Sequence, residues 1–164
     1  MTNPVVVGIV IGSDSDLDTM LETVKVLDTL GVGSEVVVAS AHRTPHRTEA
    51  WASGAAGRGL RVLIAAAGGA AALPGVVAAF SSLPVIGVPI AATPLNGMDA
   101  LLSIVQMPKG VPVATFAIGA AGAANAALFA VAMLANHDAG LRERLERYRA
   151  AQTAAARAMT QELK

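Results

Sequence analysis

Residues 40–45 (Ser-Ala-His-Arg-Thr-Pro) bring three kinds of polar side chain together at the end of an apolar run. Ser40, His42 and Arg43 supply a hydroxyl, an imidazole and a guanidinium. An imidazole, with an ordinary pKa of about 6.5, suits proton transfer near neutral pH. A guanidinium can make two parallel hydrogen bonds to a phosphate or a carboxylate. The stretch therefore predicts that Arg43 helps to hold an anionic substrate while His42 moves a proton on it.

A second polar turn, residues 12–16 (Gly-Ser-Asp-Ser-Asp), directly follows the apolar run 5–11. Backbone N–H groups at a helix start favour an anion there, and the hydroxyls of Ser13 and Ser15 add donors. Asp16 would repel a phosphate and is better suited to accept hydrogen bonds from ribose hydroxyls. An equally weighted interpretation is that a serine caps the helix and Asp16 complements its dipole.

A third turn, residues 67–70 (Ala-Gly-Gly-Ala), is rich in small residues. Gly68 and Gly69 would let a ligand approach the backbone closely. Residues 118–122 could do the same, or their glycines could serve only helix packing. Together, small-residue turns at one edge of a sheet predict a compact pocket whose backbone amides contribute to binding.

Other kinds of chemistry have little support in the sequence. His46 lies one helical turn after His42, but no carboxylate stands at a convincing ligand spacing, so we expect no metal site. The absence of cysteine excludes a disulfide framework and thiol chemistry. His137, beside Asp138, is expected to end or cap a helix. No dinucleotide fingerprint, Walker A lysine or hydrolase elbow is present.

The elements that must position these turns alternate between apolar strand runs and stretches with helical periodicity. We expect strands at residues 5–11, 35–39, 61–66, 83–90 and 111–117. Helices are expected at residues 17–30, 45–58, 98–105, 123–136 and 139–163, with a short alanine-rich helix after residue 75. This alternation predicts a three-layer, doubly wound α/β fold with a flavodoxin-like, five-stranded parallel sheet of strand order 2-1-3-4-5. In that order the turns containing Ser13, His42 and Gly68 line one crevice.

The composition indicates one domain, residues 1–164, that hides part of its surface in an oligomer. The chain is 54% hydrophobic and only 15% charged, with a mean hydropathy of +0.56. A soluble monomer with so few charged residues would expose a large apolar surface to water, so we expect part of that surface to be buried between subunits. The last helix, residues 139–163, is expected to dock on a neighbouring subunit. Trp51 is interpreted as a packing residue rather than a ligand platform.

Charge and hydropathy also limit the partners. A net charge of +0 and a pI of about 6.8 predict no binding to nucleic acid or to an acidic membrane surface. The best candidate for a membrane span, residues 111–136, is interrupted by Pro112, Gly119 and Gly122. We therefore expect no membrane span, and, without a secretory signal, a cytoplasmic protein.

Taken together, the motifs resemble the 5-(carboxyamino)imidazole ribonucleotide mutase family of purine biosynthesis (the PurE family, bacterial class I). The resemblance runs from about Val5 to Leu134. It rests on residues 12–16, 40–45, 73–75 (Leu-Pro-Gly), 84–89 (Pro-Val-Ile-Gly-Val-Pro), 101–108 (Leu-Leu-Ser-Ile-Val-Gln-Met-Pro) and 117–119 (Ala-Ile-Gly).

The resemblance implies an isomerase that works without metal, ATP or organic cofactor. A carboxylate moves from the exocyclic nitrogen of an aminoimidazole ribonucleotide to the neighbouring ring carbon. The substrate first loses carbon dioxide, which stays trapped beside the ring until the ring carbon attacks it. The family also forms homo-octamers, which agrees with the hydrophobic composition.

The resemblance also implies roles for particular residues. His42 is the proton carrier. The other members of the implied site bind the substrate: Ser13, Asp16 and Arg43 at the ribose phosphate, Ser15 and Ser40 nearby, and Gly68, Gly69 and Leu73 at the third turn.

The chain departs from the family pattern at four positions. Ala72 replaces a histidine that usually precedes Leu-Pro-Gly, and this loss could weaken substrate placement. Ala66, Leu17 and Ala100 stand where glycine, tryptophan and serine are usual. Three functions therefore stay open: the mutase, a direct aminoimidazole ribonucleotide carboxylase that uses carbon dioxide, and a paralogue or inactive nucleotide-binding subunit.

Overall fold

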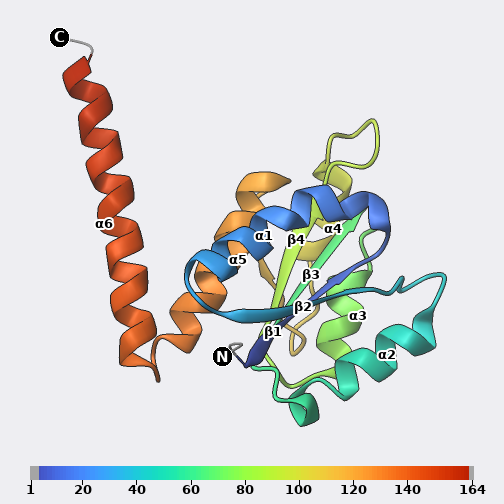
Figure 1. Ribbon diagram of the computed structural model, residues 1–164. Coiled ribbons are helices and arrows are strands. Elements are labelled where there is room, and N and C mark those ends of the chain that lie inside the picture. Colours follow the sequence, from blue (N-terminus) through green and yellow to red (C-terminus); the bar gives the residue numbers. More distant parts are fainter. Residues whose placement is uncertain (1–3, 163–164) are drawn as a thin grey trace.

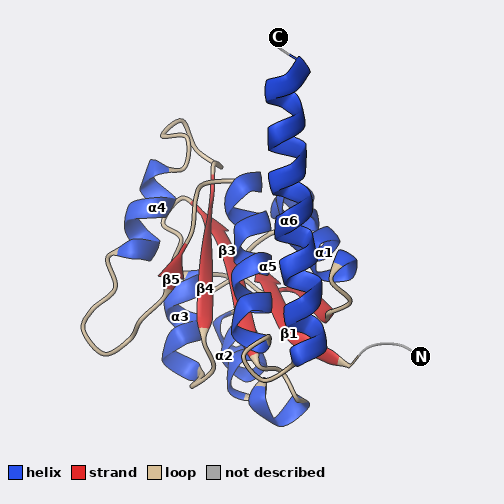
Figure 2. Ribbon diagram, turned by 90° about the vertical axis from the view of Figure 1, so that its left-hand side faces the viewer, coloured by secondary structure: helices blue, strands red, loops and turns tan. Residues whose placement is uncertain are grey.

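A five-stranded parallel sheet lies at the centre of the molecule, between two layers of helices (Figure 1, Figure 2). The computed structural model describes residues 4–162, and side chains as far as residue 159. The strand order is β2-β1-β3-β4-β5, which confirms the predicted flavodoxin-like order. The strands are β1 (Val5–Ile11), β2 (Gly33–Val38), β3 (Val62–Gly68), β4 (Val85–Ile90) and β5 (Ala114–Thr115).

Six α-helices connect and cover these strands. They are α1 (Leu17–Thr29), α2 (Pro45–Ser53), α3 (Leu73–Phe80), α4 (Met98–Val105), α5 (Ala120–Leu134) and α6 (Ala139–Glu162). Two short 3-10 turns, Asp14–Asp16 and Ala56–Arg58, add to them. Leu163, the expected end of the last helix, lies outside the described residues.

The pleat of the strands divides the core into two parts. Val7, Ile9 and Ile11 of β1 face the core beneath α1 and α5, whereas Val10 faces the core beneath α2 and α3. Successive side chains of a strand point to opposite faces, so a continuous apolar run needs cover on both faces. The seven-residue run of β1 is therefore explained by helices on both sides of the sheet.

The fifth strand is shorter than predicted. The sequence indicated residues 111–117, but only Ala114–Thr115 pair with β4. Pro112 has no N–H to donate to a neighbouring strand, and Val111 is already hydrogen-bonded to Pro108 in a turn. The helix expected at 123–136 begins at Ala120 instead.

The second predicted helix, residues 45–58, is wrong in its last turns. α2 ends at Ser53, and a separate 3-10 turn spans Ala56–Arg58. Gly59, with a φ of +93°, takes the left-handed conformation that ends this segment. The short third helix also begins earlier than expected, at Leu73, with Pro74 in its first turn.

Trp51 is a packing residue, as predicted. Its side chain is 8% exposed, and its indole N–H donates a hydrogen bond of 2.8 Å to Glu35 Oε1. A Cβ atom at Gly8 would lie 2.9 Å from the indole ring, so the absence of a side chain there makes room for Trp51. This packing holds α2, which follows the His42 loop, against the sheet.

The last helix packs on the domain only at its beginning. Leu141 and Leu145 are buried, and Tyr148 packs against the same core cluster. The rest of α6 projects away from the sheet (Figure 1). Glu143 and Arg147 form the expected i,i+4 pair at 3.8 Å. Docking of α6 on a neighbouring subunit stays a prediction.

The segment considered as a membrane span, residues 111–136, consists of loop residues, β5 and the whole of α5. Within residues 4–162, no helix has both the length and the apolar character needed to cross a membrane.

Candidate active site

Two adjoining cavities lie where β1, β2 and β3 end. The first, here called the histidine cavity, has a volume of about 280 Å³. Its walls include six of the predicted site residues: Asp16, Ser40, His42, Arg43, Gly68 and Leu73. The second, the arginine cavity, has a volume of about 430 Å³, and its walls include Ser13 and Arg43. Gly12, Ser40 and Arg43 contribute to both, so one ligand can extend from the first cavity into the second.

His42 lies in the loop between β2 and α2. The loop is held in shape by Ser40 and Thr44: the Ser40 N–H donates to Thr44 Oγ1 at 2.9 Å, and the Thr44 N–H donates to the Ser40 carbonyl at 2.9 Å. The His42 side chain is exposed, and within residues 4–162 its imidazole has no hydrogen-bond or ion-pair partner. Both ring nitrogens are therefore available to a ligand.

Arg43 connects the first two turns. Its Nη2 donates to the Gly12 carbonyl at 2.8 Å, and its Nε donates to Ser40 Oγ at 3.4 Å. The Arg43 N–H also donates to Ser40 Oγ at 3.2 Å. These bonds hold the guanidinium against the end of β1 and leave its remaining N–H groups for an anion.

Asp16 is a buried carboxylate in the wall of the histidine cavity, with 6% of its surface exposed. Burial raises the pKa of Asp16 above its ordinary value, against the opposing effects of hydrogen bonds with Ser15 and Ser13 and of the positive charge of Arg43. Ser15 Oγ donates to Asp16 Oδ1 at 3.4 Å. Hydroxyl groups of a bound sugar would add donors to a carboxylate that has lost much of its solvation.

Ser13 confirms the capping interpretation of the first turn, whereas its binding of an anion stays a prediction. Its Oγ accepts a hydrogen bond of 3.4 Å from the Ser15 N–H and so caps the 3-10 turn Asp14–Asp16. It also lines the arginine cavity. Ser15 lies beside Asp16, as the hydrogen bond shows, but does not itself line either cavity.

The glycines of the third turn have structural reasons beyond ligand approach. A Cβ atom at Gly68 would lie 2.5 Å from Ala92 Cβ, so this glycine lets the ends of β3 and β4 approach each other. Gly69 has a φ of +61° and does not line either cavity. Leu73 is 2% exposed and forms part of the histidine cavity's wall. The fourth small-residue turn serves packing: a Cβ atom at Gly122 would collide with the Ala117 carbonyl.

Sequence reasoning missed Arg47, which lines the arginine cavity together with Arg43. Its signal was a second arginine four positions after the first, in the first turn of the predicted helix. Ala71 was also not assigned to the site, yet it lines the histidine cavity together with Ala72, the position that the sequence analysis linked to substrate placement. Within residues 4–162, no cluster of three or more His, Cys, Asp or Glu side chains could hold a metal ion.

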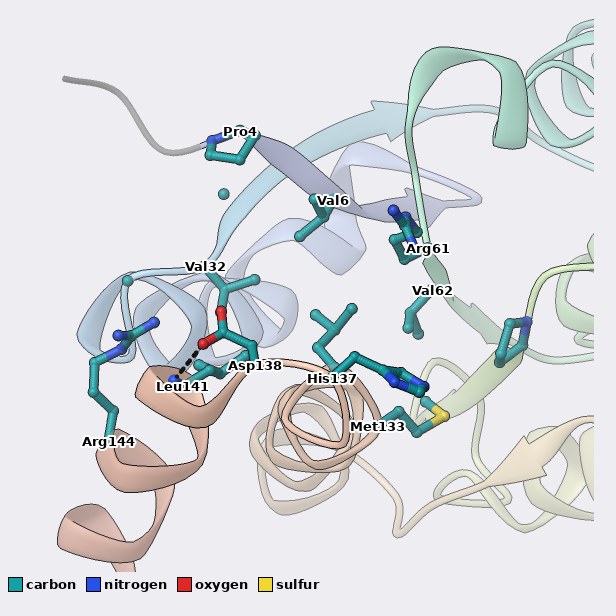
Figure 3. A pocket seen from close by; sticks show the side chains of 14 residues that line it. Pro4, Val6, Val32, Arg61, Val62, Met133, His137, Asp138, Leu141 and Arg144 are labelled. Carbon is teal, nitrogen blue, oxygen red and sulfur yellow. Dashed lines mark hydrogen bonds between the residues drawn. The ribbon is translucent and has the colours of Figure 1, made fainter.

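A larger cavity, of about 520 Å³, lies at the opposite end of the sheet, where the strands begin (Figure 3). Its walls include His137, Asp138, Arg61 and Arg144. Asp138 Oδ1 accepts a hydrogen bond of 2.9 Å from the Leu141 N–H and so caps α6 (Figure 3). His137 follows the end of α5, as predicted, and the capping role belongs to Asp138.

The fold and the site define a doubly wound α/β domain that presents an imidazole and a guanidinium at the ends of its strands, where such sheets bind ligands. A family model described as AIR carboxylase matches residues 6–155, and the chain belongs to this family. This confirms the family predicted from the sequence motifs.

Curated relatives agree. The chain is 55% identical over 147 residues to the N5-carboxyaminoimidazole ribonucleotide mutase of Vibrio vulnificus, covering 90% of this chain and 91% of that protein. It is 52% identical over 151 residues to the Escherichia coli protein of the same name, covering 92% and 89%. The crystal structure of Treponema denticola PurE has a TM-score of 0.86 at 25% identity, covering 97% of this chain and 98% of that one.

Proposed function

We propose that this protein catalyses the mutase step of purine biosynthesis that the names of its relatives describe. The carboxylate of N5-carboxyaminoimidazole ribonucleotide moves from the exocyclic nitrogen to the adjacent ring carbon, which gives 4-carboxy-5-aminoimidazole ribonucleotide. The reaction is an isomerisation, because nothing is added to or lost from the substrate. The observation that carries the proposal is the unpartnered His42 imidazole beside the Arg43 guanidinium, at the strand ends of a chain belonging to this family.

The proton balance of the reaction requires one group that both gives and takes a proton. Breaking the N–CO₂ bond leaves the exocyclic nitrogen in need of a proton, which His42 donates as carbon dioxide forms. The ring carbon then attacks the carbon dioxide, and His42 recovers a proton from that carbon. Because the carboxyl group comes from the substrate and the proton returns to His42, the reaction balances without an organic cofactor or a metal ion.

Substrate binding is divided between the two cavities. In this proposal Arg43 and Ser13 contact the phosphate, Asp16 accepts hydrogen bonds from the ribose, and Ser15 and Ser40 lie nearby. The remaining assigned residues, Gly68, Gly69 and Leu73, belong to the turn beside the base. A small apolar wall there would keep water out and hold carbon dioxide beside the ring.

Ala72 gives the histidine cavity a short methyl group at its third turn. Members of the family that the sequence resembles usually have a histidine at this position. We propose that His42 is sufficient for proton transfer and that the missing imidazole affects the placement of the substrate. An Ala72→His variant tests this, with a lower KM and an unchanged kcat as the expected result.

The proposed assembly is a homo-octamer. Exposed apolar side chains gather on one face of α4 and in the loop before it: Leu95 (62% exposed), Met98 (49%), Leu102 (52%) and Val105 (50%). Most of α6 beyond Tyr148 is exposed as well, and docking of α6 on a neighbouring subunit would cover it. Light scattering on the purified protein tests the assembly, and removal of residues 149–164 tests the contribution of α6.

The decisive experiment supplies two substrates separately to the purified protein. Conversion of N5-carboxyaminoimidazole ribonucleotide is the expected result. The second candidate, a direct carboxylase, is favoured by the description of the matching family model. Turnover of only the unmodified aminoimidazole ribonucleotide with bicarbonate would establish it instead. Binding of ribonucleotide without either turnover would indicate a non-catalytic subunit.

We also propose the cytoplasm as the site of action, because the sequence carries no secretory signal. Fractionation of cells that express a tagged chain tests this location.

A further inference from the structure

Arg47 is a cation to which the proposed function gives no role. It occupies the third position of α2, its side chain is exposed, and it lines the arginine cavity. Within residues 4–162, its guanidinium has no hydrogen-bond or ion-pair partner. Other arginines are engaged: Arg58 Nη2 contacts Glu35 Oε1 at 3.1 Å, and Arg144 Nε donates to the Leu30 carbonyl at 2.8 Å.

The charges around the arginine cavity show what such a cation would do. Arg43 and Asp14 both line this cavity, so their formal charges cancel. Two of the donors of Arg43, Nε and Nη2, are already used by Ser40 and Gly12. A phosphate monoester carries a charge of about −1.5 to −2 at pH 7. Arg43 alone therefore leaves a bound phosphate without full charge compensation.

The position of Arg47 is electrostatically unfavourable for the helix itself. The N-terminal turn of a helix has a partial positive charge, which favours acidic residues and disfavours basic ones. The first turn of α2 contains no acidic residue and holds both His46 and Arg47. A bound anion in the arginine cavity would remove this repulsion.

We infer that Arg47 is a second phosphate-binding residue, which together with Arg43 holds the phosphate of the ribonucleotide and selects phosphorylated over unphosphorylated ligands. This inference rests on the proposed function for the identity of the substrate, but the phosphate contact itself does not depend on turnover. Arg47 acts at the phosphate, far in the ligand from the carboxyl group that moves, so it contributes to binding and not to proton transfer.

The test compares Arg47→Ala and Arg47→Lys with a control, Arg61→Ala. Arg61 is an exposed arginine at the opposite end of the sheet, and its substitution removes the same charge. For Arg47→Ala we expect KM for N5-carboxyaminoimidazole ribonucleotide to rise roughly fivefold to tenfold, with kcat changed less than about twofold. Arg47→Lys should recover part of the loss. The effect should shrink as salt increases, because exposed charges are screened. Arg61→Ala should match the unaltered protein.

Binding probes separate this inference from the proposed function. Inorganic phosphate and ribose 5-phosphate should bind several-fold more weakly to Arg47→Ala in calorimetry, whereas binding of ribose should be unchanged. If the unaltered protein shows no turnover, the proposed function fails and these binding data still decide the role of Arg47. Equal phosphate affinity of Arg47→Ala and the unaltered protein would overturn the inference, as would a fall in kcat with KM unchanged. Thermal melting curves check that each variant is folded.

Discussion

Each end of the sheet has a cavity with a histidine and an arginine in its walls, but the two ends differ in how their polar groups are used. At the amino ends of the strands, Asp138 caps α6 and Arg144 bonds to the Leu30 carbonyl. At the carboxyl ends, His42 and Arg47 have no partner within residues 4–162. The cavity at the amino ends is the larger one, at about 520 Å³. Within residues 4–162 the side chains of His137 and Arg61 at the amino ends also have no hydrogen-bond or ion-pair partner, so free polar groups alone do not distinguish the two ends. What differs is that, at the carboxyl ends, His42 and Arg43 line one cavity with the buried carboxylate of Asp16.

The polarity of the fold explains this difference. In a parallel sheet, each strand runs into a loop that leads to a helix N-terminus, and these loops gather at the carboxyl edge with their N–H groups exposed. The opposite edge receives helix C-termini and the starts of strands. Polar groups there, such as Asp138, are used to begin and join the elements.

The largest expected effect separates the two histidines. His42→Asn should lower kcat by about 10²–10⁴, the usual contribution of a general acid–base group, while ribonucleotide binding changes little. His137→Asn, at the other end of the sheet, should leave kcat and KM unchanged. Steady-state kinetics and calorimetric binding measure both. Normal turnover by His42→Asn would show that another group carries the proton.

The next effect concerns binding at the carboxyl edge. Arg43→Ala should weaken substrate binding by about 1.5–3 kcal/mol, the typical value of a hydrogen bond to a charged group, which raises KM about tenfold or more. Arg43→Lys should recover the charge but not the bonds to Gly12 and Ser40, so its KM should be intermediate. An unchanged KM for Arg43→Ala would place the anion elsewhere.

Removing the N-cap of α6, at the amino ends of the strands, should affect stability and not activity. Asp138→Ala removes the acceptor for the Leu141 N–H and should cost about 1 kcal/mol of the free energy of unfolding. For a domain of this size that corresponds to a fall in Tm of about 2–4 °C. Calorimetry measures the Tm, and kcat/KM per folded protein should be unchanged. A loss of activity without a loss of stability would mean that this end takes part in the reaction.

The sequence was sufficient for the sheet order and for bringing most residues of the candidate site to one edge of the sheet, for a clear reason. Each functional turn directly follows an apolar strand run, so the positions of Ser13, His42 and Gly68 along one edge follow from strand order alone. The limits of β5 did not follow, because Pro112 has no N–H to pair with β4 and the Val111 N–H bonds to the Pro108 carbonyl in a turn, so only Ala114–Thr115 pair. Periodicity also gave no sign that α2 stops at Ser53.

Individual side-chain contacts were harder to predict from the sequence than the order of the strands. The reason for Gly68 is the approach of Ala92, which follows the end of β4 and has no signal near position 68. Arg47 was missed because a lone arginine in a helix usually faces solvent, and only the fold shows that it borders the same cavity as Arg43. Contacts between distant segments require the structure.

The smallest expected effect concerns a second carboxylate, with the opposite sign to Asp138. Because burial raises the pKa of Asp16 above its ordinary value of 3.8, the folded protein binds more protons at this group than the unfolded chain does between 3.8 and the raised pKa. The contribution of Asp16 to stability therefore falls as pH rises through that window. At neutral pH the ionised carboxylate destabilises the fold relative to a neutral side chain of the same shape.

Asp16→Asn should accordingly have a slightly higher Tm than the unaltered protein at pH 7, and the difference should diminish as pH falls toward and below 3.8, because Asp16 then becomes protonated in both states. Substrate binding should weaken, since an amide accepts hydrogen bonds from ribose hydroxyls less strongly than a carboxylate does. The measurement is the difference in Tm between the two proteins across this pH range. Asp138→Ala lowers stability because it removes a cap, whereas Asp16→Asn raises it because it removes a buried charge. A lower Tm for Asp16→Asn at pH 7 would show that Asp16, like Asp138, serves the fold.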